Sequence, residues 1–128
     1  MTEPVAGEQK LAIVLNRDLM FGSRIRGALK MLGLEARFVS DTEGFMAALA
    51  TEAEVAAIGI LDMNGEIDWE TFFTAVRDTA DVPPTLAFGP HVDVENRRAA
   101  KAAGVTRIVS NGQFHSDMAA LIERYRRR

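Results

Sequence analysis

A single carboxylate stands where a long apolar run of the sequence ends. Residues 55–61 carry no polar side chain, and Asp62 follows them directly. A carboxylate at the mouth of a parallel strand, near a second one such as Asp18, suits Mg²⁺-assisted phosphoryl chemistry in which Asp62 is the nucleophile and the metal offsets charge. The structural alternative is that Asp62 only satisfies backbone amides in the loop that follows it.

Other common chemistries lack their residues in this sequence. The turn that begins Asn16-Arg17-Asp18 is not rich in glycine, and neither a dinucleotide-binding motif nor a P-loop occurs. The two histidines, His91 and His115, have no Gly-x-Ser-x-Gly nucleophile elbow to serve. We therefore expect no enzyme activity and no resident cofactor, with Mg²⁺ bound only if Asp62 is a working phosphoacceptor.

The composition fits one globular domain. The chain has 128 residues, of which 48% are hydrophobic and 26% charged. Fifteen Lys and Arg against 18 Asp and Glu give a net charge of −3, which disfavours general nucleic-acid affinity. Because the sequence has no cysteine and no apolar run near the roughly 20 residues of a membrane span, we expect a cytoplasmic protein without membrane contact.

Short apolar runs alternate five times with segments of helical period, after a polar arm at residues 1–9. The predicted strands are residues 11–15, 35–39, 55–61, 85–88 and 105–109. The predicted helix N-caps are Asn16 or Asp18, one of residues 40–43, Asp68, Asp93 and Ser116. This alternation predicts an α/β fold of the flavodoxin-like class, in which residues 10–128 form one doubly wound domain. Its five-stranded parallel sheet has the order 2-1-3-4-5 and helices on both faces.

Details of the predicted helices rest on spacing alone. The apolar stripe of the first helix includes Leu19 and Met20, and that of the third includes Phe72 and Phe73. His115 is interpreted as an ordinary residue at the entrance of the last helix. These expectations decide which side chains lie in the core.

In this fold, ligands bind at the carboxyl ends of the strands, near the switch point between the first and third strands. The residues expected at that crevice are Asn16, Arg17 and Asp18, then Asp62, Met63 and Asn64, then Gly89, Pro90 and His91, and finally Ser110 and Asn111.

The order of elements, Asp62 at the end of the third strand, and the segments 84–88 and 99–105 together resemble the CheY-like receiver domains of two-component response regulators. The resemblance covers about residues 10–126. It implies that Asp62 holds the place of the aspartate that accepts a phosphoryl group from a histidine kinase.

Four other functional positions depart from that family's pattern. Asn16 and Arg17 stand where the family has an acidic pair that binds Mg²⁺, and Asp18 comes one position late. Gly89 replaces a Thr or Ser, and Asn111 replaces a Lys. Such a site lacks the charge compensation that phosphoryl transfer needs, and the guanidinium of Arg17 is expected near Asp62 instead. The pattern predicts a degenerate receiver, or pseudo-receiver.

Three functional hypotheses follow. The leading one is a stand-alone pseudo-receiver signalling module that acts by protein–protein contact without phosphorylation, with a kinase, an output protein or a second copy in a homodimer as its partner. The second is a functional phospho-receiver with Asp62 as phosphoacceptor and Asp18 as metal ligand. The third is a small-ligand sensor or enzyme that uses the altered crevice of Arg17, Asp62, His91 and Asn111.

Basic residues gather in two places. Arg97, Arg98 and Lys101 lie on the predicted fourth helix, and four arginines stand within residues 124–128. They form a face suited to an acidic partner or to a homodimer. The terminal arginines have a structural alternative, which is to balance the dipole of the last helix.

Overall fold

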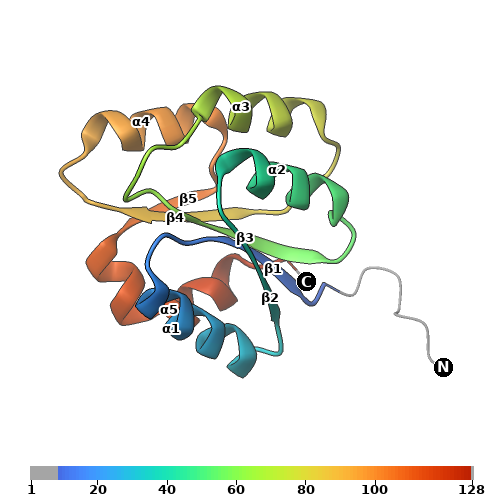
Figure 1. The fold of residues 1–128 in the computed structure, drawn as a ribbon, viewed down its shortest axis with the longest axis vertical. Coiled ribbons are helices and arrows are strands. Elements are labelled where there is room, and N and C mark those ends of the chain that lie inside the picture. The colour runs from blue at the N-terminus through green and yellow to red at the C-terminus, as the bar shows by residue number, and fades with distance from the viewer. Residues whose placement is uncertain (1–8, 128) are drawn as a thin grey trace.

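The strands of the computed structural model, which describes residues 9–127, form one parallel sheet in the order β2-β1-β3-β4-β5 (Figure 1). Helices α1 and α5 cover one face of the sheet, and α2, α3 and α4 cover the other (Figure 1). The elements are β1 Leu11–Leu15, α1 Leu19–Met31, β2 Glu35–Val39, α2 Thr42–Thr51, β3 Ala56–Asp62, α3 Trp69–Asp78, β4 Thr85–Gly89, α4 Val94–Ala103, β5 Arg107–Ser110 and α5 Asn111–Tyr125. The predicted fold class and strand order are confirmed.

Aspartates start the first four helices. The predicted caps Asp68 and Asp93 are confirmed, Asp18 is used and not Asn16, and Asp41 is the cap within residues 40–43. In each case a side-chain oxygen accepts a hydrogen bond from a backbone N–H of the first turn, which would otherwise lack a partner. The pairs are Asp18 with Met20 at 2.9 Å, Asp41 with Gly44 at 2.7 Å, Asp68 with Thr71 at 3.0 Å and Asp93 with Asn96 at 3.2 Å. These caps set the helix starts just beyond the carboxyl ends of the strands.

The start of the last helix differs from the prediction. Helix α5 begins at Asn111, and its N-cap is Ser110, whose hydroxyl accepts from the backbone N–H of Gln113 at 3.1 Å. The predicted cap, Ser116, lies inside the helix, next to a kink at Asp117 where φ is −121° and ψ is 26°. The prediction of Ser116 as the cap was wrong, because the helix already begins at Asn111 and uses Ser110.

The core has one layer on each face of the sheet, and β1 and β3 contribute to both. Two predictions of buried side chains were wrong. Leu19 and Met20 are 93% and 80% exposed, since the buried side of α1 consists of Gly22, Ile25 and Leu29. On α3, Phe72 is fully buried, whereas Phe73 is 47% exposed and lies under the guanidinium of Arg77.

Arg127, one of the arginines near the C-terminus, takes part in the fold. The Arg127 side chain donates to the carbonyl oxygens of Ala53 and Ala56, and it forms an ion pair with Asp81 at 3.1 Å. Its backbone N–H donates to Ala57 O at 3.0 Å. Arg127 therefore ties the end of the chain to the loops that precede β3 and β4, a role that neither sequence interpretation of these arginines includes.

Two further expectations concern the N-terminal arm and contact with a membrane. The predicted arm at residues 1–9 lies outside the described residues except for Gln9. Within residues 9–127, no helix is long and apolar enough to cross a membrane.

Candidate functional site

Asp62 is buried at the end of β3, with 2% of its surface exposed. Its Oδ1 accepts from the backbone N–H and from Nδ2 of Asn64, both at 2.8 Å. Its Oδ2 accepts from the backbone N–H of Arg17 at 3.1 Å. Both oxygens of the carboxylate therefore have N–H donors. The bond from the backbone of Asn64 is the kind expected if Asp62 satisfies backbone amides in the loop that follows it.

Asn64 connects Asp62 to the start of α5. Its Nδ2 donates to Oδ1 of Asn111 at 2.9 Å, and Nδ2 of Asn111 donates back to Oδ1 of Asn64 at 2.8 Å. The two amides form a reciprocal pair between the loop after β3 and the first residue of α5. Asn111 is thus connected to Asp62 through Asn64. Both of these side chains are neutral amides.

The guanidinium of Arg17 points away from the position predicted for it. It donates to the carbonyl oxygen of Glu66 at 2.5 Å, and within the described residues no ion pair joins it to Asp62. The side chain passes over Gly65, where a Cβ atom would lie 2.7 Å from Arg17 Nε. A larger residue at position 65 would make the flexible Arg17 side chain move. The prediction that the guanidinium lies beside Asp62 was wrong because a backbone carbonyl in the next loop binds it.

Asn16 and Asp18 stabilise the start of α1. Nδ2 of Asn16 donates to the carbonyl oxygen of Asp18, and Asp18 Oδ1 accepts from Met20 N–H as the helix cap. The Asn16 Oδ1 atom is buried without a hydrogen-bond partner, but it is one neutral oxygen. Asp18 is the nearest available second carboxylate, and its cap role already uses one oxygen.

These residues do not fit a Mg²⁺ site. Magnesium takes near-octahedral oxygen ligands and depends on carboxylates for charge. At the ends of β1 and β3 the side chains are an amide, a guanidinium, a capping aspartate and an aspartate that accepts three hydrogen bonds. Within residues 9–127, no group of three or more His, Asp or Glu side chains is arranged to hold a metal ion.

Gly89 ends β4 and allows a close approach of the neighbouring chain. A Cβ atom at this position would lie 3.0 Å from Cβ of Met63, a residue that is itself only 2% exposed. A larger side chain, including one with a hydroxyl, would make Met63 shift by a few tenths of an ångström. A Ser or Thr at this position would therefore be in tight contact with Met63.

A small cavity of about 280 Å³ opens beside Asp62. It is lined by Arg17, Asp18, Phe21, Asp62, Asn64, Asn111 and His115. The rings of Phe21 and His115 stack at 3.9 Å between centroids, so α1 and α5 close one side of it. Desolvation lowers the pKa of His115, the nearby Arg24 lowers this pKa further, and the charges of Asp62 and Asp18 oppose both effects.

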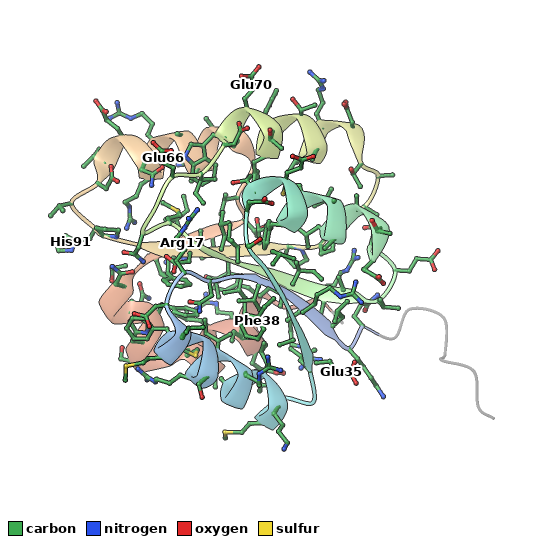
Figure 2. All side chains as sticks on the ribbon, viewed as in Figure 1. Arg17, Glu35, Phe38, Glu66, Glu70 and His91 are labelled. Atoms are coloured by element: carbon green, nitrogen blue, oxygen red, sulfur yellow. The ribbon has the colours of Figure 1, made fainter. Side chains whose placement is uncertain are left out.

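The crevice predicted from the sequence is therefore partly right. Arg17, Asp62 and Asn111 meet at the cavity, but His91 is exposed and does not line it. Figure 2 shows His91 at the periphery of the molecule, away from Arg17. The missed residues are Phe21 and His115. Once α5 is known to start at Asn111, His115 falls four residues later on the same side of the helix, which is the signal that could have identified it.

Arg17 also lines a larger, open groove of about 970 Å³ formed by the loops after β2, β3 and β4. The groove carries five carboxylates and no cation besides Arg17, and these carboxylates are Asp41, Glu43, Glu66, Asp68 and Asp93. Figure 2 shows Arg17 and Glu66 on this side of the molecule. Three of the carboxylates are helix N-caps, so much of the negative charge of this groove follows from the capping of the helices.

The chain matches several solved structures along most of its length. The chemotaxis protein CheY4 of Vibrio cholerae superposes with a TM-score of 0.69 at 16% identity, covering 91% of this chain and 98% of that chain. A response regulator receiver domain of Bermanella marisrubri superposes with a TM-score of 0.75 at 16% identity, covering 92% and 98%. This chain has the CheY-like receiver fold. A CheY-like protein, tadZ, of Pseudomonas aeruginosa shares the receiver fold with a TM-score of 0.70 at 15% identity, covering 91% and 99%.

No family model matches the sequence, and no curated protein matches it. The similarity to response regulators therefore lies in the fold.

Proposed function

We propose that this receiver-fold protein is a signalling module that acts by contact with other proteins and does not depend on phosphorylation of Asp62. The observation that carries the proposal is the hydrogen bonding of the Asp62 carboxylate. Both oxygens accept from N–H groups of Arg17 and Asn64, and Asn64 is itself held by Asn111. The carboxylate therefore has a structural role in joining three loops.

Phosphoryl transfer to Asp62 would have to disrupt this arrangement. N–H donors already use three of the roughly four lone-pair sites of the carboxylate, and a buried N–H that lost its acceptor would cost roughly 1–3 kcal/mol. The transferred group also needs positive charge from a metal or an ammonium group. Asn16 and Arg17 supply no carboxylate for a metal, Asn111 supplies no ammonium, and Gly89 supplies no hydroxyl.

The partner we propose is a signalling protein with an acidic surface. A groove of about 520 Å³ between α4 and β5 is lined by four cations and no carboxylate, and its lining is Val94, Arg97, Arg98, Lys101, Val105, Thr106, Arg107 and Ile108. Val94 at its rim is 57% exposed. A surface with both basic and apolar groups suits a kinase, an output protein or a second copy with complementary charge.

The direct chemical test uses a small phosphoryl donor. The protein and its Asp62→Asn variant are incubated with acetyl phosphate and Mg²⁺, and intact masses are recorded over time. We expect neither protein to gain the mass of a phosphoryl group. A wild-type adduct that maps to Asp62 and is missing from Asp62→Asn would establish the phospho-receiver alternative, with Asp18 as the metal ligand.

The cavity beside Asp62 favours one second candidate function, the sensing of a small ligand. Its stacked Phe21 and His115 rings and the amides of Asn64 and Asn111 offer apolar and polar contacts together. A ligand at 100 times its dissociation constant would stabilise the protein by about 2.7 kcal/mol. Thermal melting against a panel of small metabolites, repeated with Phe21→Ala, tests this function.

A further inference from the structure

Two Asn-Gly dipeptides meet at the candidate site. Asn64 precedes Gly65 in the loop after β3, and Asn111 precedes Gly112 at the start of α5. Their side chains are the reciprocal amide pair that covers Asp62. The fold thus places two residues of the same reactive sequence in direct contact.

An Asn-Gly sequence can convert its amide to a carboxylate without an enzyme. The backbone nitrogen of the glycine attacks the side-chain Cγ of the asparagine, and a new C–N bond closes a five-membered succinimide ring. The Cγ–Nδ2 bond breaks, and the side-chain nitrogen leaves as ammonia with the proton of the glycine N–H. Water then opens the ring at either carbonyl and leaves aspartate or isoaspartate. Glycine favours this attack because it has no Cβ and its backbone is freely rotatable.

The site itself accounts for both residues of the first dipeptide. Glycine at position 65 leaves room for the Arg17 side chain, since a Cβ there would be 2.7 Å from Arg17 Nε and this side chain would have to move. Asn64 needs both an amide donor and an amide acceptor, since it donates to Asp62 and Asn111 and accepts from Asn111. The reactive pair is therefore part of the architecture of this loop.

The two dipeptides differ in backbone freedom. Asn64 is exposed and lies in an irregular bend between β3 and α3. Asn111 is half-buried as the first residue of α5, where the helical backbone fixes its own ψ angle. The attack needs the glycine nitrogen to approach Cγ, so it is easier at Asn64 than at Asn111. In the folded protein, Asn64 is restrained by the hydrogen bonds of its side chain and by the bond from its backbone N–H to Asp62.

We propose that Asn64 is a site of spontaneous deamidation and that the Asn111 amide protects it. Conversion places a carboxylate at position 64 against the acceptor oxygens of Asp62 and Asn111, where the amide of Asn64 now donates. Two adjacent carboxylates repel each other, and the amide pair opens. The modification therefore turns the neutral cover of Asp62 into a second acidic group, independently of whether Asp62 is ever phosphorylated.

The test compares full-length variants during incubation at mildly alkaline pH, with peptide mapping by mass spectrometry. Asn111→Ala removes two hydrogen bonds from Asn64, and each is worth roughly a factor of five in opening. We expect Asn64 in this variant to convert about 5- to 25-fold faster than in the wild type. Wild-type protein unfolded in urea should also convert faster than the folded protein.

Gly112→Ala is the matched control, because no heavy atom lies within 4 Å of a Cβ built at position 112. It should slow conversion at Asn111 and leave the rate at Asn64 unchanged. Melting curves establish that each variant is folded, and Asn111→Ser replaces Asn111→Ala if the latter is not. The proposal is overturned if loss of the Asn111 amide does not accelerate conversion of Asn64, or if Asn111 converts first in the folded wild type.

Discussion

Asn64 and Asn111, 47 residues apart in sequence, donate a hydrogen bond to each other through their side-chain amides at 2.9 and 2.8 Å. The pair joins the loop after β3 to the first residue of α5 and holds Asn64 against the Asp62 carboxylate. A buried carboxylate is costly unless it is paired or hydrogen-bonded. Here backbone and amide N–H groups donate to both of its oxygens.

The amide pair should be measurable as a coupling energy. Asn64→Ala and Asn111→Ala each remove the reciprocal bonds, and Asn64→Ala also removes a donor from Asp62. We expect Asn64→Ala to lower the free energy of unfolding by about 1–3 kcal/mol and Asn111→Ala to lower it less. Urea unfolding of both single variants and the double variant should give a coupling of at least about 0.5 kcal/mol. Strict additivity would mean that the pair contributes nothing.

Restoring a hydroxyl at the end of β4 should destabilise the protein. In Gly89→Thr the new Cβ would lie 3.0 Å from Met63 Cβ, so the loop after β3 must shift. We expect a loss of about 1–3 kcal/mol in urea unfolding.

Gly27→Ala is the control for that substitution. Gly27 lies inside α1, where a Cβ meets no atom within 4 Å, so the helix should gain up to about 1 kcal/mol. A Gly89→Thr variant as stable as the wild type would show that Met63 does not restrict this position.

The Arg127 contacts should contribute to stability. Arg127→Ala leaves the carbonyl oxygens of Ala53 and Ala56 without this donor and removes the ion pair with Asp81. The expected loss is about 1–3 kcal/mol. Arg124 is exposed and only lies over the Tyr125 ring, so Arg124→Ala should change thermal stability little. Equal effects of the two substitutions would indicate that general positive charge, and not the Arg127 contacts, is responsible.

Stability should fall as the pH drops below about 6.5, in part because of His115. Desolvation and Arg24 hold the pKa of His115 below its ordinary value in the folded protein. The unfolded chain therefore binds this proton first, which favours unfolding once the pH passes below the unfolded pKa. At neutral pH and above, the group is neutral in both states and has no effect.

His115→Phe tests that assignment while it keeps a ring stacked on Phe21. Its unfolding free energy should depend less on pH between about 7 and 5 than that of the wild type. An NMR titration should show the His115 imidazole protonating below the ordinary pH range of histidine. A wild-type pH profile that the substitution leaves unchanged would exclude His115 as the cause.

Most of the fold could be predicted from patterns of residues that are close in the sequence. The apolar runs and the aspartate caps lie within a few residues of each other along the chain, so the sequence alone could predict β1, β2 and the starts of α1 and α3. Ser110 and Ser116 are equally good caps by residue type, and only packing distinguishes them. Because the start of α5 was predicted at the wrong residue, the position of His115 at the cavity was not predicted.

Contacts between distant loops could not be read from the sequence. Arg17 has both Asp62 and the carbonyl of Glu66 within the same region of the fold, and its backbone contacts the first while its guanidinium binds the second. Which of these two groups the flexible Arg17 guanidinium binds depends on the path of the loop after β3. The strand-end position of Asp62 was predictable, but the partners of its two oxygens were not.

The most direct test of a phosphorylation-independent module is thermal melting with Mg²⁺ and beryllofluoride, which mimics an aspartyl phosphate. Wild type and Asp62→Asn are melted with and without the mixture. We expect the same melting temperature for the wild type in both conditions, because both Asp62 oxygens accept hydrogen bonds and residues 9–127 contain no cluster of three or more acidic or histidine side chains that could hold the metal. A rise of several degrees in the wild type that disappears in Asp62→Asn would show instead that Asp62 is a phosphoacceptor.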